Sequence, residues 1–436
     1  MRTPLLAALV LASPALAQTW IVDASGNGDF TTLQAAIDQA SEGDVLLIEP
    51  AAQSYDEAQL SKSLTLVGRT SGGQQPRIES LDVQLTSSVT LFGLEFDKLR
   101  LKDLSGLVLV DSCVFGSAQG DSNVGWPAGP ATFGDFIASP LLIEDCADAR
   151  VVHSESYPGE TFALGFAAAI VRGASQAQFT SCRLIGKDVD TDMGLEGWGG
   201  DALDVGDSSH VLVADSQLIG GHGENDVLDG WYIKHYGLGG NALLLRGAAT
   251  AEVRGNSSHR LREGLGNGLG DPFFGLSNPG DGDAVACALD STGQADLYGP
   301  TIEGELGSCA TLHPTARPFL SLADTSQALG PIVAPGGTRS ASVHASPTST
   351  AVLLGSLSPA ALELSLVETT AVWVDLGSLL QVTSGVPTGP TSTLDVQWTL
   401  PASPQFAGLS YHVQGFELAP SLQLLGTNAG AITFAN

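Results

Sequence analysis

The sequence predicts an all-β protein: a right-handed parallel β-helix with a short N-terminal capping helix, followed by a small C-terminal module that resembles a β-sandwich. Three observations lead to this prediction. Related segments recur in the middle of the chain at offsets of 34 and 40 residues, and each consists of short runs with apolar residues at every second position. The chain contains 53 glycines and only 15% charged residues, which is typical of a β-rich chain with many turns. After about residue 316, longer alternating segments replace the repeat.

The first eighteen residues predict export. "MRTPLLAALVLASPALAQ" contains an arginine near its start, an apolar run, and small residues before Gln18. This pattern is typical of a secretory signal peptide, so we expect residues 1–18 to be removed and the protein to be secreted or held at the cell surface. No later run reaches the roughly 20 apolar residues of a membrane span, and we expect none.

The next element is predicted to be the capping helix. Leu33, Ala36, Ile37 and Ala40 form one apolar stripe at helical spacing, which suits a helix that closes the open end of a solenoid. The runs "DVLLIEP" and "SLTLVG", which come after this stripe, are predicted to be the first strands of the solenoid.

The repeated segments predict that residues 19–315 form the coils of the β-helix. The segments that align best are residues 167–186, 201–220 and 241–260. The second half of the unit is matched by residues 107–116 and 141–149, and more loosely by residues 284–304. Because no unit can bury its apolar side alone, successive units must stack, and equivalent residues must form columns along the solenoid.

One predicted column holds three of the five cysteines. Its aligned positions are Cys113, Cys146, Cys182, Ser216 and Asn256. Neighbouring coils lie about 4.8 Å apart, within the range of a disulfide, so a 113–146 or a 146–182 bridge is one interpretation. Buried free thiols are the interpretation that we favour. Cys287 and Cys309 lie about one coil apart and are the better disulfide candidate.

The charge of the chain limits its partners. There are 47 acidic residues against 18 basic ones, which gives a formal net charge of −29. Such a surface repels nucleic acid and other polyanions, so we expect no nucleic-acid partner. An anionic sugar would need a bridging cation or a locally basic patch. We expect a monomer.

The N-terminal region resembles a known family. The stretch "WIVDASGNGDFTTLQAAIDQASEGDVLLIEPAAQSYDEAQLSKSLTLVG", residues 20–68, resembles the opening of pectin-lyase-like β-helix proteins of the exported bacterial type, especially the pectin methylesterases. The resemblance in pattern extends over about residues 20–310 and implies the β-helix fold. The catalytic motifs of the esterases are missing. Asp135 in "GDFIASP" is the single match to an active carboxylate, and the later Leu-Gly-Arg-Pro-Trp element is absent.

Insertions between the units predict a binding surface. They follow the same turn each time, at residues 117–138, 147–165, 187–199, 221–239 and 257–281. Coils that stack in register place such insertions side by side, so they should form one continuous wall. The wall contains aromatic residues that we predict to bind a polysaccharide, which are Trp126, Trp198, Trp231, Tyr232 and Tyr236. The alternative is that these aromatics form small cores that hold the loops in place.

The stretch "IGKDVDTDMGLEGWGG", residues 185–200, predicts a cation site. Its carboxylates alternate with other residues, and hard cations prefer clustered carboxylate oxygens. The predicted Ca²⁺ ligands are Asp188, Asp190, Asp192 and Glu196, with Glu224 and Asp226 from the next insertion. The glycine falls one position too late for an EF-hand, and a solvated acidic loop is the alternative.

The chain also contains partial signatures of polysaccharide-cleaving enzymes. "GHG" at residues 221–223 and "YIK" at residues 232–234 resemble two elements of polygalacturonase-type hydrolases, whose other elements are absent. Asp201 and Asp204 are the candidate carboxylate pair for such a hydrolysis. A β-eliminating lyase needs a group that neutralises a uronate and a base that removes the C5 proton. Basic residues for these roles lie near the acidic insertions, and they are Arg260, Arg262, Lys234 and His235. This is the most coherent catalytic set, with ion pairing to nearby acids as its structural alternative.

Residues 316–436 are predicted to form the C-terminal module, which begins with a Pro-, Ser- and Gly-rich stretch and continues with alternating segments. Together, these patterns predict an exported protein that binds polysaccharide along the wall of insertions, and they leave open whether it also cleaves the polysaccharide as a calcium-assisted lyase. The alternative is a non-catalytic cell-surface, adhesion or structural protein.

Overall fold

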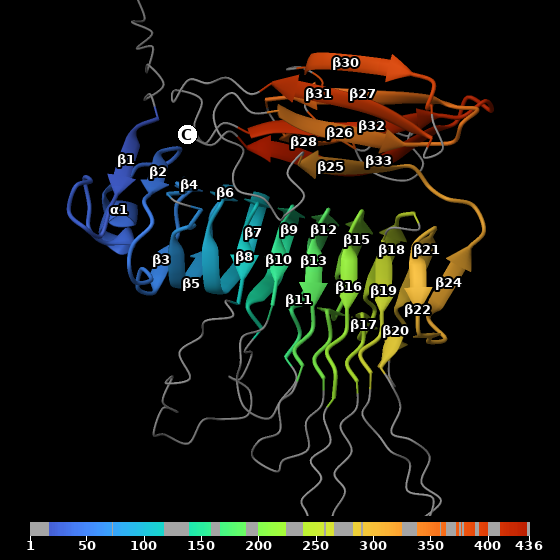
Figure 1. Cartoon of the computed structure of the whole chain (residues 1–436), viewed down its shortest axis with the longest axis horizontal. Helices are drawn as coiled ribbons and strands as arrows, with labels where there is room; N and C mark the ends of the chain where they lie inside the picture. Colours follow the sequence, from blue (N-terminus) through green and yellow to red (C-terminus); the bar gives the residue numbers. More distant parts are fainter. Residues whose placement is uncertain are drawn as a thin grey trace, which may run out of the picture.

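The chain folds into a parallel β-helix and a separate β-rich module (Figure 1). The computed structural model describes residues 17–71, 73–116, 139–157, 166–188, 199–223, 239–256, 259–265, 282–288, 291–324, 338–357, 359–362, 372–374, 376, 379–388, 392–399 and 410–433. Within this part of the chain, β1–β24 pair into one 24-stranded sheet. Parallel pairing with the strand one coil away confirms the predicted β-helix.

Each coil contributes up to three strands, which we assign to a first, a second and a third stack in the order in which the chain passes through them. The first stack contains β3 (Ala58–Leu60), β11 (Ala169–Arg172), β14 (Leu203–Val205), β17 (Leu243–Leu245), β20 (Asp283–Cys287) and β23 (Glu305–Leu306). The second contains β1 (Thr19–Val22), β2 (Val45–Ile48), β4 (Thr65–Gly68), β6 (Val89–Phe92), β12 (Gln176–Thr180), β15 (His210–Ala214), β18 (Thr250–Arg254), β21 (Gln294–Tyr298) and β24 (Ala310–His313). The third contains β8 (Val114–Phe115), β10 (Glu155–Ser156), β13 (Arg183–Ile185), β16 (Gln217–Ile219), β19 (Arg260–Arg262) and β22 (Thr301–Glu303).

Three longer strands pass through more than one stack. β5 (Arg77–Gln84) joins the third stack to the first, and β9 (Leu141–Val152) joins the first to the second. β7 (Glu95–Asp111) passes through all three. The predicted strands in "DVLLIEP" and "SLTLVG" are β2 and β4, but β1 already pairs with β2 ahead of the helix, which the sequence did not predict.

Tight corners between the stacks are made by residues with positive φ. The corner from the first to the second stack contains Asp103, Asp145, Gly173, Asp207 and Gly247. This conformation costs a non-glycine residue about 1–2 kcal/mol. Aspartate offsets part of that cost by accepting hydrogen bonds from the next coil or the previous one. Asp207 Oδ2 accepts from the backbone N–H of Gly173 at 2.8 Å, and Asp145 Oδ1 accepts from the backbone N–H of Ala174 at 3.2 Å.

The core is a continuous column of apolar side chains between the three stacks, from β1 to β21. Helix α1 (Leu33–Gln39) covers the N-terminal end of this column with Leu33, Ala36 and Ile37, as predicted. Lys62 closes the last turn of α1 by donating from Nζ to three backbone carbonyl oxygens at 2.8–2.9 Å. Within the described residues, no helix is long and apolar enough to span a membrane.

The structure corrects the predicted cysteine column. The equivalent positions hold Cys113, Ser154, Cys182, Ser216 and His259. Cys146 lies instead near the other corner, level with Leu104, so residues 141–149 match the first half of the repeat unit rather than the second. Asn256 lies in the corner turn before His259. The pairing offset rises from 40 residues at Ala214–Arg254 to 43 at Gln217–Arg260, so this turn is three residues longer.

The pairing of the cysteines is the one that the sequence analysis favoured. Cys287 and Cys309 form a disulfide with a Cα–Cα distance of 6.1 Å, which staples the last coil to the one before it. Cys113, Cys146 and Cys182 are free and buried.

The C-terminal module consists of antiparallel sheets. One contains β25 (Phe319–Asp324), β26 (Thr338–His344) and β31 (Thr393–Thr399); a second contains β30 (Leu379–Gly385), β27 (Thr350–Ser356), β32 (Ser410–Leu418) and β33 (Leu424–Thr433); β28 (Pro359–Leu362) pairs with β29 (Val372–Val374). The Pro-, Ser- and Gly-rich stretch at the start of the module thus contributes two of its strands, β25 and β26. The module lies against the second stack, where Leu109 and Val152 share an apolar cluster with Leu320 and Leu322 (Figure 1).

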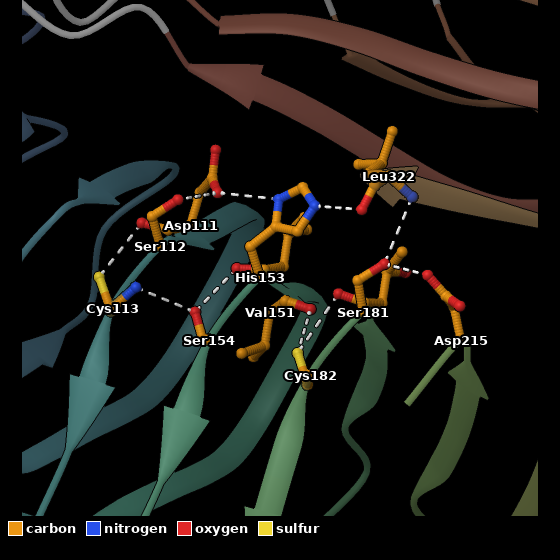
Figure 2. Close-up of polar contacts among 12 residues, drawn as sticks. Asp111, Ser112, Cys113, Val151, His153, Ser154, Ser181, Cys182, Asp215 and Leu322 are labelled. Carbon is orange, nitrogen blue, oxygen red and sulfur yellow. Dashed lines mark hydrogen bonds and ion pairs between the residues drawn. The ribbon is translucent and has the colours of Figure 1, made fainter. Parts of the chain in front are cut away.

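Polar groups complete the contact between module and solenoid. Figure 2 shows His153, on a corner of the solenoid, directed at the backbone carbonyl of Leu322, with Nε2 and the oxygen 2.5 Å apart. The backbone N–H of Leu322 donates to Ser181 Oγ at 3.3 Å, and the Ser181 hydroxyl donates to Asp215 Oδ2. Deeper in the contact, Arg254 donates from Nη1 to Gly426 O at 2.7 Å. Ser, His and Asp are therefore close together here, but they hold the module in place and do not form a catalytic triad.

Candidate functional site

The insertions leave the solenoid at one corner, between the third and the first stack. They follow β8, β10, β13, β16 and β19, which pair with one another in register. The departure points are therefore equivalent, as the wall prediction requires. Two predicted boundaries are wrong. β9 continues to Val152 and β10 to Ser156, so no insertion begins at residue 147. Residues Arg260–Arg262 form β19, so the insertion predicted at 257–281 does not begin at residue 257.

Closely packed backbone segments form the base of the insertions. We name them the glycine ladder; its members in spatial order are Lys187, Gly200, Gly221, Gly240, Gly264 and Gly282. Each backbone N–H donates to the carbonyl oxygen of the preceding member at 2.8–2.9 Å. Members that leave the solenoid alternate with members that return to it. An added Cβ at Gly221 would lie 1.9 Å from Lys187 O, so the packing requires glycine there.

Two side chains that the sequence singled out connect neighbouring insertions at their base. Asp188 Oδ1 accepts a hydrogen bond from the backbone N–H of His222 at 2.6 Å. His222 Nδ1 accepts one from the backbone N–H of Leu265 at 2.9 Å. Both side chains therefore satisfy backbone groups of the next coil.

Most of the residues predicted to bind a cation, a sugar or a uronate lie outside the described part of the chain. They are Asp190, Asp192, Glu196, Glu224, Asp226, Trp126, Trp198, Trp231, Tyr232, Tyr236, Lys234 and His235. Among the residues that are described, no group of three or more His, Cys, Asp or Glu side chains is arranged to hold a metal ion.

The outward side chains of the third stack form the surface next to this corner, which we name the third face. Its first row contains Glu95, Val114, Glu155, Arg183, Gln217, Arg260 and Thr301. Its second row contains Gly116, Tyr157, Ile185, Ile219, Arg262 and Glu303. Stacking thus collects arginines and hydrogen-bonding side chains from segments far apart in the sequence.

A group of three polar side chains stands out on this face. The Tyr157 hydroxyl donates to Glu155 Oε2 and accepts from Arg183 Nη1 at 2.9 Å. Glu155 exposes 7% of its surface, and its Oε1 has no hydrogen-bond partner. Burial raises the pKa of the Glu155 carboxyl, although the Tyr157 hydroxyl and the Arg183 charge act against that rise. A carboxyl group in this environment can hold a proton and donate it.

The predicted basic pair lies on the same face. Arg260 is half exposed, and its Nη1 lies 3.6 Å from Glu303 Oε1. Arg262 is at the neighbouring outward position of β19, level with Glu303. His259 just before them is buried, contacts Asp215 through Nε2, and packs edge-on against Phe319 of the module, so it has a structural role.

On the other side of the corner, the first stack carries the predicted carboxylate pair. Asn241 donates to Asp201 Oδ1 from its backbone N–H at 2.8 Å and from Nδ2 at 2.7 Å. Burial, with a smaller effect of the charge on Asp204, raises the pKa of Asp201 to about 6. Arg246 Nε donates a hydrogen bond to Asp204 Oδ1 at 2.9 Å. Both carboxyl groups therefore already have partners in the fold.

Glu155, Tyr157 and Arg183 were not predicted as site residues. Glu155 and Tyr157 lie in "SESY", two residues apart, but Arg183 becomes their neighbour only through coil stacking. The available signal was the pairing register of β10 with β13. The sequence alignment did not reveal that register, because it matched residues 141–149 to the wrong half of the repeat unit.

Comparison with known proteins adds little to this description. No protein-family model and no curated protein sequence matches the chain. Among solved structures, the full-length tailspike protein 2 of an Escherichia coli O157:H7 bacteriophage matches 97% of this chain at 8% identity, with a TM-score of 0.28, and the chain spans 64% of that protein. The enzymatically active domain of tailspike protein 2 from bacteriophage CBA120 matches 92% of this chain at 9% identity, with a TM-score of 0.23, over 73% of its own length.

Proposed function

We propose that the protein is exported and binds an anionic polysaccharide along its third face. The observation that carries this proposal is the gathering of Arg183, Arg260 and Arg262 on one face, across three neighbouring coils, in a chain with 47 acidic and 18 basic residues. A local group of cations in an otherwise anionic protein favours a ligand with negative charges at defined positions.

The spacing of the face suits a chain of sugars. Successive coils repeat every 4.8 Å or so, which is close to the length of one pyranose unit in an extended polysaccharide. Arg183, Gln217 and Arg260 lie on consecutive coils in one row, so carboxylates and hydroxyls of successive sugars can meet them in turn. The half-exposed Arg260 keeps its charged end accessible to such a ligand.

A finer form of the proposal is cleavage by calcium-assisted β-elimination. In it, Arg260 and Arg262 neutralise a uronate carboxylate, Lys234 or His235 is the base that takes the C5 proton, and the acidic residues around Asp188 hold Ca²⁺. The observation in its favour is that Arg260 and Arg262 face outward beside the corner from which the insertions leave. Elimination would give unsaturated product ends that absorb ultraviolet light. Release of these ends with Ca²⁺, and its loss with a chelator, would support this form.

Binding is tested by calorimetric titration of the full chain with polygalacturonate and alginate, and with dextran as a neutral polysaccharide. The double variant Arg260→Ala/Arg262→Ala is expected to weaken binding of the anionic polysaccharide at least tenfold, a loss of about 1.4 kcal/mol. The matched control is Arg100→Ala, which removes an exposed arginine from the first stack and is expected to leave binding unchanged.

Other outcomes separate this proposal from its competitors. Equal binding by the double variant and the wild type would rule out the third face as the binding surface. The variant Trp198→Ala/Trp231→Ala then tests the predicted wall of insertions. Failure to bind any polysaccharide would favour a non-catalytic surface or adhesion protein.

A further inference from the structure

Five consecutive coils of the third face differ in a regular way in the charge of their outward side chains. Their strands are β10, β13, β16, β19 and β22, which follow one another along the solenoid (Figure 1). The second and the fourth of these coils carry arginines, Arg183 on β13 and the pair Arg260 and Arg262 on β19. The outward side chains of the other three coils are neutral or acidic. Positive charge therefore recurs on every second coil.

The middle coil, which contains β16, separates the two levels of arginine with neutral side chains. Gln217 pairs with Arg183 on one side and with Arg260 on the other, so the three share one row. All three point away from the core, because the leucine that follows each of them in the sequence is buried. Ile219, the second outward position of β16, is partly exposed. The Gln217 amide both donates and accepts hydrogen bonds, and Ile219 offers an apolar surface, so this level suits an uncharged sugar.

The coils at the two ends of this pattern also lack a basic side chain on the third face. The level of β10 presents Glu155 and Tyr157, and the level of β22 presents Thr301 and Glu303. The Glu303 side chain is 40% exposed. A ligand carboxylate one coil beyond Arg260 would therefore meet a like charge.

The distance between the two basic levels matches two sugars. Neighbouring coils lie about 4.8 Å apart, so Arg183 and Arg260 stand on strands roughly 10 Å apart. One sugar of an extended polysaccharide takes up about one coil. A chain of sugars that runs along the solenoid therefore meets a basic level at every second sugar.

A polysaccharide with a carboxylate on every sugar fits this pattern less well. If its carboxylates all lay along one edge, those of the intermediate sugars would meet levels that have no base. If they alternated between two edges, the intermediate ones would point toward the corners that border the third face. Asp188 and Asp215 already place carboxyl groups at those corners. Either arrangement leaves half of the ligand charge without a partner.

Tyr157 fixes the position of the first arginine. Its hydroxyl accepts a hydrogen bond from Arg183 Nη1 at 2.9 Å, and the guanidinium carbon lies 5.7 Å from the centre of its ring. A guanidinium group has five N–H donors, so this bond leaves others for a ligand carboxylate. Because Arg183 is held before a ligand arrives, less side-chain entropy is lost on binding. The spacing of the basic levels is therefore a property of the fold.

We propose that the third face selects a polysaccharide with an acidic disaccharide repeat, in which charged and uncharged sugars alternate. This inference rests on the proposed function, because it requires an anionic polysaccharide on the third face. One acidic sugar lies at Arg183, an uncharged sugar lies at Gln217 and Ile219, and the next acidic sugar lies at Arg260 and Arg262. The same arrangement fits the β-elimination described above, which needs a uronate at Arg260 and Arg262.

Calorimetric titration of the full chain at one ionic strength tests the selection. Hyaluronan and unsulfated chondroitin alternate a uronate with an uncharged N-acetylhexosamine, whereas polygalacturonate has a uronate at every position. We expect the affinity per binding site to be at least about tenfold higher for the two alternating polymers. Polygalacturonate carries more charge per unit length, so attraction by charge density alone would give the opposite order.

The variant Gln217→Arg places a base on the middle coil. It is expected to raise the affinity for polygalacturonate about tenfold and to leave that for hyaluronan within about twofold, because the new base meets a carboxylate in one polymer and an uncharged sugar in the other. The matched control is Gln176→Arg, which adds the same charge at an exposed position of β12 in the second stack. This control should change the two affinities little and to the same extent.

The other outcomes separate this inference from the proposed function. Equal affinities for the two kinds of polymer, or a higher affinity for polygalacturonate, overturn the inference and leave the binding of anionic polysaccharide standing. An equal gain for both polymers in Gln217→Arg also overturns it, because the added charge would then act without regard to its position. If none of the anionic polymers binds, the proposed function itself fails.

Discussion

At the scale of single residues, Glu155 is a group that the fold maintains at a cost. Burial raises its pKa above the ordinary value of 4.5, so ionisation is less favourable in the folded chain than in the unfolded one. Protonated Glu155 therefore contributes stability to the folded chain. This contribution is complete below pH 4.5 and is lost as the pH rises through the pKa that Glu155 has in the folded chain. A fold that keeps such a group, with one oxygen unpartnered, carries a penalty that a neutral side chain would avoid.

The free thiols give a second residue-scale prediction. Burial raises the pKa of Cys113, Cys146 and Cys182 to about 12 each. Because the thiolate is the reactive form, the native protein should not react with iodoacetamide at pH 8. Mass spectrometry should find three labels per chain after unfolding without reductant and five after reduction, since Cys287 and Cys309 are bridged. Labelling of the native chain would contradict the burial of these thiols.

At the scale of elements, the glycine ladder should be intolerant of side chains. Gly221→Ala places a methyl group 1.9 Å from the carbonyl oxygen of Lys187, where only backbone can move away. We expect urea denaturation to show a loss of about 1–3 kcal/mol in the free energy of unfolding, as overpacking usually gives. The matched control is Gly206→Ala, whose new methyl would meet only the Cβ of Arg172, at 3.9 Å. Equal effects of the two changes would show that the ladder is not tightly packed.

The elements also show what the sequence could predict. The apolar stripe of α1 and the period-two strands were recognisable because their spacing is local. The 34-residue offset gave the correct register of Val171 with Val205, because both coils have corners of equal length. The 40-residue offset failed at Ser216, whose partner in the next coil is His259 and not Asn256, because an ungapped alignment cannot accommodate a corner that is three residues longer.

The candidate site was harder to predict for a related reason. Arg260 and Arg262 were found because they are close in sequence and rare in type. Glu155 and Arg183 lie 28 residues apart, and their contact through Tyr157 depends on the exact register of β10 with β13. A site assembled by stacking becomes visible only when every corner length is known.

At the scale of the whole molecule, the stability of the folded chain should depend on pH through His412. His412 on β32 exposes 4% of its surface, and burial, with a smaller effect of the positive charge on Arg150, lowers its pKa from 6.5 to about 3. A group whose folded pKa is depressed in this way is neutral in the folded state and gains a proton on unfolding. The stability it supports is complete above pH 6.5 and is lost as the pH falls toward 3.

The expected size follows from linkage. Between pH 7 and pH 5, His412 should contribute about 2 kcal/mol of lost unfolding free energy. His412→Gln removes the titrating group, so the decline between these two pH values should be smaller by about that amount. Urea denaturation of the full chain at both values measures it. An identical decline in the variant and the wild type would place the pH dependence in other groups.

The glycine ladder constrains the sequence of the solenoid more than the sequence of the insertions. Because each insertion leaves and returns through backbone that is hydrogen-bonded to its neighbours, the solenoid needs only glycine and correct spacing at those points. The sequence carried between them can be exchanged without altering the pairing of the coils. The solenoid thus provides fixed backbone positions at which each insertion begins and ends. A lineage could change what the protein recognises, one insertion at a time, without having to evolve a new fold.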